Sequence, residues 1–121
     1  MPRRLLSLIE AGGYPDFRPL YEQLGFEVVT EYSVRRAQAR LREFSPDVLV
    51  ADFYKRYFHD RVSNLESLLT IKSRLPETRI IVIYDPFHEA DLEQLRQRCA
   101  IDFTLPLPVT PATMEKALFA Q

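Results

Sequence analysis

The sequence predicts an α/β fold in which a parallel sheet of five strands carries helices on both faces. Short apolar runs alternate with longer amphipathic segments along the 121 residues, which is typical of parallel βαβ units. One of these runs, residues 80–83 (Ile-Ile-Val-Ile), is apolar throughout, as expected for a strand that is covered on both faces. Prolines and glycines stand where the periodic segments end, so that each strand and helix has a marked boundary.

The first three elements are two strands with a short helix between them. We expect the strands over residues 4–9 and 27–31 and the helix over residues 17–24. Asp16 supplies an oxygen that can cap the helix N-terminus, and Gly25 ends the helix.

A second amphipathic helix follows the second strand. Ser33 is its expected N-cap, and Pro46 ends it. The helix is predicted by apolar residues at three- and four-residue steps, which form one buried stripe: Val34, Ala37, Leu41 and Phe44.

The third strand is the most informative stretch of the chain. Residues 46–52 read Pro-Asp-Val-Leu-Val-Ala-Asp, so that a helix-ending proline leads into an apolar strand that ends on a carboxylate, Asp52. In an open α/β sheet the ligand crevice lies at the carboxyl ends of the strands. We therefore expect Asp52 at that crevice.

A long loop over residues 53–62 precedes the third helix and the fourth strand. Ser63 and Glu66 match a capping box at the start of that helix, and Pro76 ends it. Its inner face is expected to carry four leucines: Leu65, Leu68, Leu69 and Leu75. The fourth strand covers residues 79–84.

The last third of the chain contains a helix, a strand and a helix. The fourth helix is expected over residues 89–98, with Leu92, Leu95 and Cys99 on its inner side, and the fifth strand over residues 101–105. Thr110 caps the last helix and Pro111 opens it. Because crossovers in such units are right-handed, the strand order 2-1-3-4-5 is the most economical sheet for five strands of this size.

Composition favours one soluble globular domain over residues 1–121. Hydrophobic residues make up 46% and charged residues 27%, and the net charge is −1, which argues against a general nucleic-acid binder. No apolar run approaches the roughly 20 residues that span a bilayer, so we expect no membrane contact. With one cysteine there is no internal disulfide, and a cytoplasmic location is expected.

Three segments resemble the receiver domain of bacterial response regulators, the chemotaxis-regulator type of flavodoxin-like fold. Residues 24–28 (Leu-Gly-Phe-Glu-Val) resemble the end of the family's first helix and the start of its second strand. Residues 46–52 resemble its third strand, and residues 102–111 its last strand and the proline turn into the final helix. The resemblance implies two-component signalling by phosphorelay, with Asp52 as the phospho-acceptor.

The residues that support phosphorylation in this family are altered. The family's first strand ends on an acidic pair that holds Mg²⁺, whereas here Glu10 is the acid in the matching region. Tyr84, followed by Asp85, stands in place of the phosphate-binding Ser or Thr, and Leu107 in place of the phosphate-pairing lysine. A phosphoryl group would lose a charge-assisted contact worth roughly 1.5–3 kcal/mol without that lysine.

The leading hypothesis is a non-enzymatic pseudo-receiver without a cofactor, which acts by binding a protein partner or a second copy of itself. On this hypothesis Asp52 is a strand-end carboxylate that serves as a hydrogen-bond acceptor or loop cap. The alternative is an atypical phospho-accepting regulator in which Glu10 helps Asp52 to bind Mg²⁺ weakly. A third, weaker hypothesis is a small-ligand binder that uses Gly12, Gly13 and the aromatic loop after Asp52.

Partner contact is expected from two groups of aromatic residues. Aromatic and arginine side chains are favoured at protein interfaces, and the loop after Asp52 combines four rings with basic residues. These rings could equally fold inward as a lid over the acidic pocket. The resemblance adds the face of the fourth helix, fifth strand and fifth helix. The candidates are Phe53, Tyr54, Tyr57, Phe58, Phe87 and Phe103.

Overall fold

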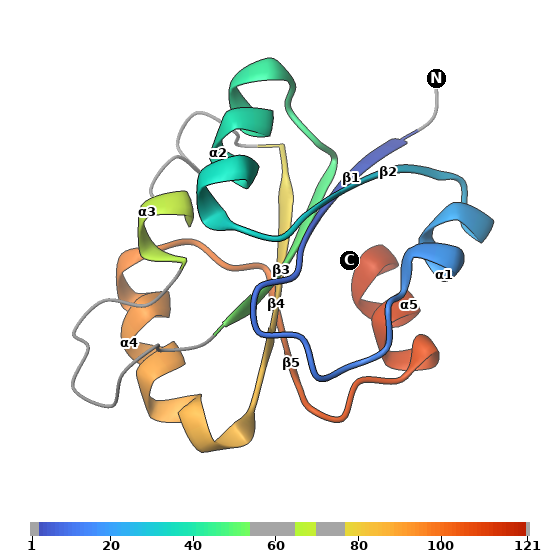
Figure 1. Ribbon diagram of the computed structural model, residues 1–121. Coiled ribbons are helices and arrows are strands. Elements are labelled where there is room, and N and C mark those ends of the chain that lie inside the picture. The colour runs from blue at the N-terminus through green and yellow to red at the C-terminus, as the bar shows by residue number, and fades with distance from the viewer. Residues whose placement is uncertain (1–2, 54–64, 70–76, 121) are drawn as a thin grey trace.

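The computed structural model describes residues 3–53, 65–69 and 77–120. Its centre is a parallel five-stranded sheet in the order β2-β1-β3-β4-β5, which confirms the predicted order (Figure 1). The strands are β1 (Arg3–Leu8), β2 (Phe26–Glu31), β3 (Val48–Phe53), β4 (Arg79–Tyr84) and β5 (Phe103–Pro106).

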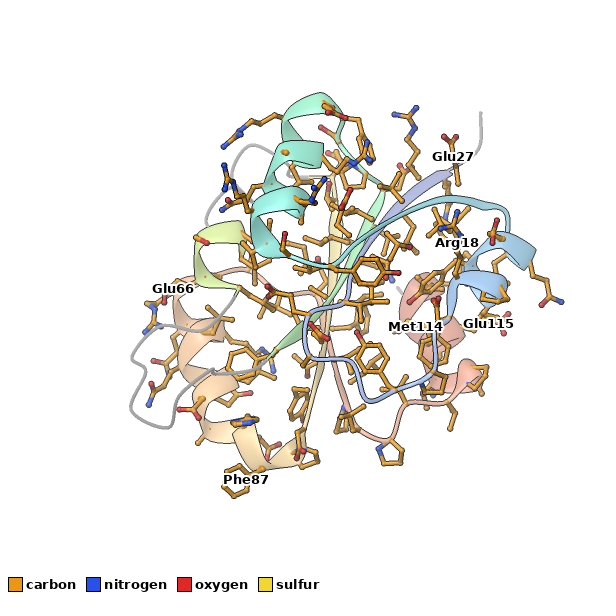
Figure 2. All side chains as sticks on the ribbon, in the orientation of Figure 1. Arg18, Glu27, Glu66, Phe87, Met114 and Glu115 are labelled. Atoms are coloured by element: carbon orange, nitrogen blue, oxygen red, sulfur yellow. The ribbon has the colours of Figure 1, made fainter. Side chains whose placement is uncertain are left out.

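Helices cover both faces of this sheet, as expected for parallel strands joined by crossovers. The helices are α1 (Arg18–Gln23), α2 (Val34–Glu43), α3 (Glu66–Leu69), α4 (Glu89–Arg98) and α5 (Pro111–Phe119), with a short 3₁₀ turn, η2 (Pro86–His88), before α4. Helices α2, α3 and α4 lie on one face, and α1 and α5 lie on the other (Figure 1). An ion pair between Arg98 and Glu66 at 2.8 Å links α4 to α3 (Figure 2).

Successive strand residues point to opposite faces and form two buried clusters. The α2-side cluster lies under α2, α3 and α4 and includes Leu6, Leu8, Leu49, Ala51, Phe53, Ile80, Val82 and Tyr84. The α1-side cluster lies under α1 and α5 and includes Leu5, Val48, Val50, Ile81, Ile83, Val109 and Met114. The fully buried Met114 of α5 faces the sheet in this second cluster (Figure 2).

Helix starts follow the predicted capping residues at α2 and α5. The Ser33 hydroxyl accepts the Arg36 N–H at 3.2 Å, and Thr110 and Thr113 form a reciprocal capping box ahead of Pro111. Helix α1 differs, because its N-cap is Phe17. The Asp16 carboxylate still accepts the Arg18 N–H at 2.9 Å, but from the residue directly before the N-cap.

Among the strand boundaries that differ from the prediction, the end of β3 and the start of β5 have a clear structural reason. Strand β3 continues to Phe53, which pairs with Tyr84 of β4 and is only 3% exposed. Strand β5 begins at Phe103, two residues later than predicted. The preceding residue, Asp102, bonds to Ile80 of β4 through both its backbone and its side chain. The Asp102 N–H donates to the Ile80 carbonyl, and the Asp102 carboxylate accepts the Ile80 N–H at 2.7 Å.

Part of the third crossover lies outside the described residues. Ser63 and Leu75, and most of the predicted loop over 53–62 with Tyr54, Tyr57 and Phe58, belong to that part. The three described leucines of the predicted inner face, Leu65, Leu68 and Leu69, are buried. Along the described ranges, no helix combines the length and apolar character that crossing a membrane requires.

Candidate functional site

Asp52 lies at the carboxyl end of β3, where the crevice of an open α/β sheet forms. Because Val48 and Val50 point into the α1-side cluster, strand alternation turns the Asp52 side chain toward the same face. The residue is 3% exposed, although its side chain carries a carboxylate. Such a group stays buried only when its oxygens accept hydrogen bonds.

The loop between β1 and α1 supplies these bonds. One carboxylate oxygen, Oδ2, accepts the N–H groups of Ala11 at 2.9 Å and Gly12 at 3.0 Å. The Glu10 N–H lies 3.0 and 3.1 Å from the two oxygens, and the Tyr14 hydroxyl donates to Oδ2 at 3.1 Å. Three successive backbone N–H groups that converge on one anion form a nest, a concavity that binds anions. Here the anion is a side chain of the protein itself.

Glycine makes this loop possible. Gly12 and Gly13 have φ angles of +71° and +83°, in the left-handed region that other residues rarely adopt. These angles turn the chain back over the end of β3, so that the Gly12 N–H meets the carboxylate. The third hypothesis placed this Gly-Gly pair in a small-ligand site. In the structure, the pair shapes a loop that is anchored on Asp52.

Tyr14 is the residue of this site that sequence reasoning missed. Burial, and then the charge of Asp52, raise the pKa of the Tyr14 hydroxyl far above its usual range. The hydroxyl therefore keeps its proton and donates a hydrogen bond to Asp52. An aromatic residue directly after a Gly-Gly pair, in a loop that faces a strand end, was the available signal.

Glu10, the second carboxylate considered for Mg²⁺, is engaged elsewhere. Its Oε2 accepts the N–H of Val34, at the first turn of α2, at 3.3 Å. Mg²⁺ takes a near-octahedral set of oxygen ligands, one or two of them from carboxylates, and here the carboxylates of Asp52 and Glu10 accept backbone N–H groups. Across residues 3–53, 65–69 and 77–120, no three His, Cys, Asp or Glu side chains group as metal ligands would. Among the described residues, the fit to a Mg²⁺ ion is therefore poor.

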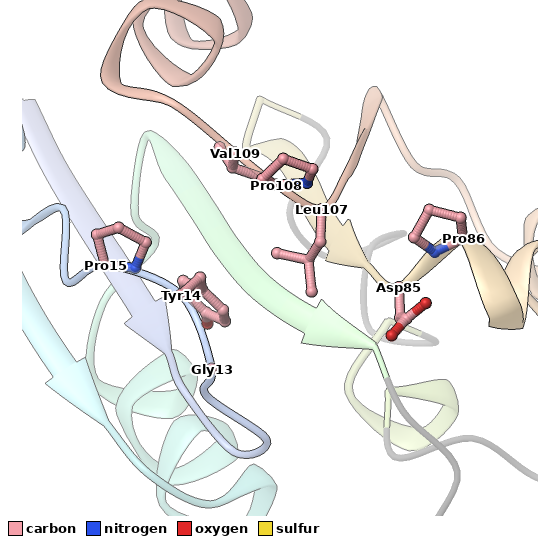
Figure 3. A pocket seen from close by; sticks show the side chains of 8 residues that line it. All are labelled: Gly13, Tyr14, Pro15, Asp85, Pro86, Leu107, Pro108 and Val109. Atoms are coloured by element: carbon pink, nitrogen blue, oxygen red, sulfur yellow. The ribbon is translucent and has the colours of Figure 1, made fainter.

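The structure separates Tyr84 from the Asp52 side of the sheet. The Tyr84 side chain belongs to the α2-side cluster, where its hydroxyl lies 3.5 Å from Glu89. Burial, and then Glu89, raise the pKa of Tyr84. The next residue, Asp85, lines a pocket of about 380 Å³ together with Leu107 and Tyr14 (Figure 3). Asp85 therefore stands at the crevice, at the place where Tyr84 was expected.

The described partner-contact candidates differ in exposure. Phe53 is a core residue, 3% exposed, because it lies within β3 and points into the α2-side cluster, so it is not a surface contact. Phe103 is half-buried, with the Arg79 guanidinium 5.3 Å from its ring centre. Phe87 is 81% exposed and projects from η2 into solvent (Figure 2).

Comparison of the sequence with protein-family models and with curated proteins finds no match. The fold, in contrast, is similar to that of solved receiver domains. A response regulator receiver domain protein from Clostridium thermocellum is 21% identical, with a TM-score of 0.76 over 96% of this chain and 90% of that one. The chemotaxis response regulator CheY4 of Vibrio cholerae is 19% identical, with a TM-score of 0.71 over 98% and 97%.

A BeF3-activated receiver domain, that of DrrB, gives a TM-score of 0.68 at 19% identity, over 98% of each chain. These similarities establish that the chain has the receiver fold, as the resemblance implied.

Replacing Asp52 by Asn tests the loop anchor. We expect Asp52→Asn to lower the free energy of unfolding by about 1–3 kcal/mol, because an amide NH₂ would face N–H donors left without an acceptor. Urea unfolding followed by circular dichroism measures this. Asp85→Asn is the matched control and should stay within about 0.5 kcal/mol, since Asn caps η2 as well as Asp does. An Asp52→Asn protein as stable as the parent would contradict the anchor.

Alkaline unfolding tests the buried hydroxyl. Burial raises the pKa of both Tyr14 and Tyr21, so each contributes stability that is complete below about pH 10, the unfolded value, and is lost as pH rises further. Tyr14→Phe should make this loss shallower by about 1.4 kcal/mol per pH unit. Urea unfolding between neutral pH and the alkaline limit measures the slope. Tyr32→Phe, at an exposed position, should keep the parent slope. A Tyr14→Phe slope equal to that of the parent would count against the assignment.

Proposed function

We propose that this chain is a receiver-type signalling domain that acts through protein–protein contact and does not accept a phosphoryl group. The receiver fold supports a role in two-component signalling, and a cytoplasmic location is part of the proposal. The observation that carries the proposal is the engagement of the Asp52 carboxylate by the N–H groups of Glu10, Ala11 and Gly12. The same carboxylate that would have to attack phosphorus holds the loop in place.

The chemistry of phosphoryl acceptance supports this reading. Attack on phosphorus by Oδ2 would disturb its hydrogen bonds from Ala11, Gly12 and Tyr14. Attack by Oδ1 would disturb its hydrogen bond from the Glu10 N–H. A bound phosphoryl group also needs cations around it. The neighbouring pocket offers instead the apolar Leu107 and the carboxylate of Asp85, which has the wrong sign (Figure 3).

For the partner surface we favour the start of α4. Phe87 is 81% exposed, and the adjacent Pro86 is also exposed, so a partner could bury both without unfolding any element. Aromatic side chains of this kind dominate contact energies when they are desolvated at an interface. The partner is another protein or a second copy of this chain.

Beryllofluoride with Mg²⁺, a mimic of the bound phosphoryl group, tests the loss of phosphorylation. In two-dimensional ¹H–¹⁵N NMR spectra, we expect the amide signals of Glu10, Ala11, Gly12 and Phe53 to stay in place, because Asp52 forms no adduct and keeps its bonds to the loop. Asp52→Asn is the baseline, since it cannot form the adduct.

Saturable shifts in the parent that are absent from Asp52→Asn would overturn the proposal. They would establish the alternative, an atypical phospho-accepting regulator that uses Asp52. If those shifts also required Mg²⁺, Glu10 would be the candidate second ligand of the ion.

A further inference from the structure

The pocket beside Asp52 has the size of a small-ligand site. It measures about 380 Å³, within the range of 300–1,000 Å³ that is common for such sites. Three loops at the carboxyl ends of β1, β4 and β5 build it, which is where ligands bind in open α/β sheets (Figure 3). The residues that matter for its chemistry are Tyr14, Pro15, Asp85, Pro86, Leu107 and Pro108.

This pocket is chemically distinct from the Asp52 site. Asp52 is not among the described lining residues, whereas Tyr14 belongs to both sites. The Tyr14 ring lines the pocket while its hydroxyl is bonded to Asp52, so the ring forms part of the wall and the hydroxyl is already used. A ligand in the pocket would therefore meet the ring of Tyr14, not the buried carboxylate.

The lining is apolar and poor in hydrogen-bond donors. Pro15, Pro86 and Pro108 have no backbone N–H, and Leu107 contributes an aliphatic side chain. An anion such as phosphate would find few donors on these walls, whereas a ring or a branched alkyl group would bury apolar surface against them.

One charged side chain, Asp85, stands among the described lining residues. Its Oδ1 accepts the Phe87 N–H at 2.9 Å, a bond that fixes the carboxylate at the rim and leaves Oδ2 for a ligand. In Figure 3, Leu107 lies between Tyr14 and Asp85, so that an apolar group against Leu107 would bring an attached nitrogen to the carboxylate.

We propose that this pocket binds a small organic amine, a primary ammonium group attached to an apolar body of about the size of a phenyl ring. The ammonium group pairs with Asp85, and the apolar body packs between Tyr14, Leu107 and the prolines. This inference goes beyond the proposed function, because the pocket could bind an amine whether or not Asp52 accepts a phosphoryl group.

Two matched probes, phenethylamine and phenylacetate, test the inference, since they share a ring and differ in the sign of their charge. In NMR titrations of the full chain at equal millimolar concentrations, phenethylamine should shift the amides of Gly13, Asp85 and Leu107 saturably. Its affinity should exceed that of phenylacetate by about two- to fivefold, the effect expected for a solvent-exposed ion pair.

Two variants separate charge from shape. Asp85→Asn keeps the cap of η2 and should abolish the preference for the amine. Leu107→Lys places an ammonium group of the protein in the pocket and should remove amine binding. Three results would overturn the inference: no saturable shift with phenethylamine, equal affinity for the two probes in the parent, or a preference that survives in Asp85→Asn.

Discussion

The hydrogen bonds between the Asp52 carboxylate and the loop after β1 are the constraint on which the carboxyl edge of the sheet depends. They draw Glu10, Ala11 and Gly12 over the end of β3 and place the Tyr14 ring against the neighbouring pocket. A charged group buried to this extent is tolerable only with several donors. The loop therefore takes its shape around the oxygens of Asp52, and Asp52 stays buried because the loop covers it.

Glu10 extends the same constraint to the helical layer. Its backbone N–H donates to Asp52, and its carboxylate accepts the Val34 N–H at the start of α2. One residue thus links β3, the loop and α2. Asp52 and Glu10, which the resemblance associates with phosphate and Mg²⁺, make contacts within the protein in this structure. Next to them, Leu107 and three prolines line a pocket suited to apolar groups, and Asp85 is the charged residue among its described lining residues.

Much of the fold was predictable because its signals are local. Proline and glycine mark the ends of the elements. The hydroxyl residues Ser33 and Thr110 predict two helix starts as N-caps, and the structure confirms both. The face of the sheet to which each strand residue points is harder to predict. Strands β3 and β4 are covered on both faces, so apart from Asp52 and Arg79 they are built from apolar and aromatic residues and carry little alternating signal. For that reason the sequence did not show that Tyr84 packs into the α2-side cluster while Asp85 lines the crevice. The donors to Asp52 depend on positive φ angles at two glycines, which a sequence permits but does not specify.

Amide hydrogen exchange of the loop after β1 tests the central claim most directly. If Asp52 holds this loop, the Ala11 and Gly12 amides exchange slowly in the parent. Asp52→Ala should then speed their exchange by about ten- to a hundredfold, as the loss of roughly 1.4–3 kcal/mol of local stabilisation requires, while amides of β4 change much less. Rapid exchange of both loop amides in the parent, unchanged in the variant, would contradict the account.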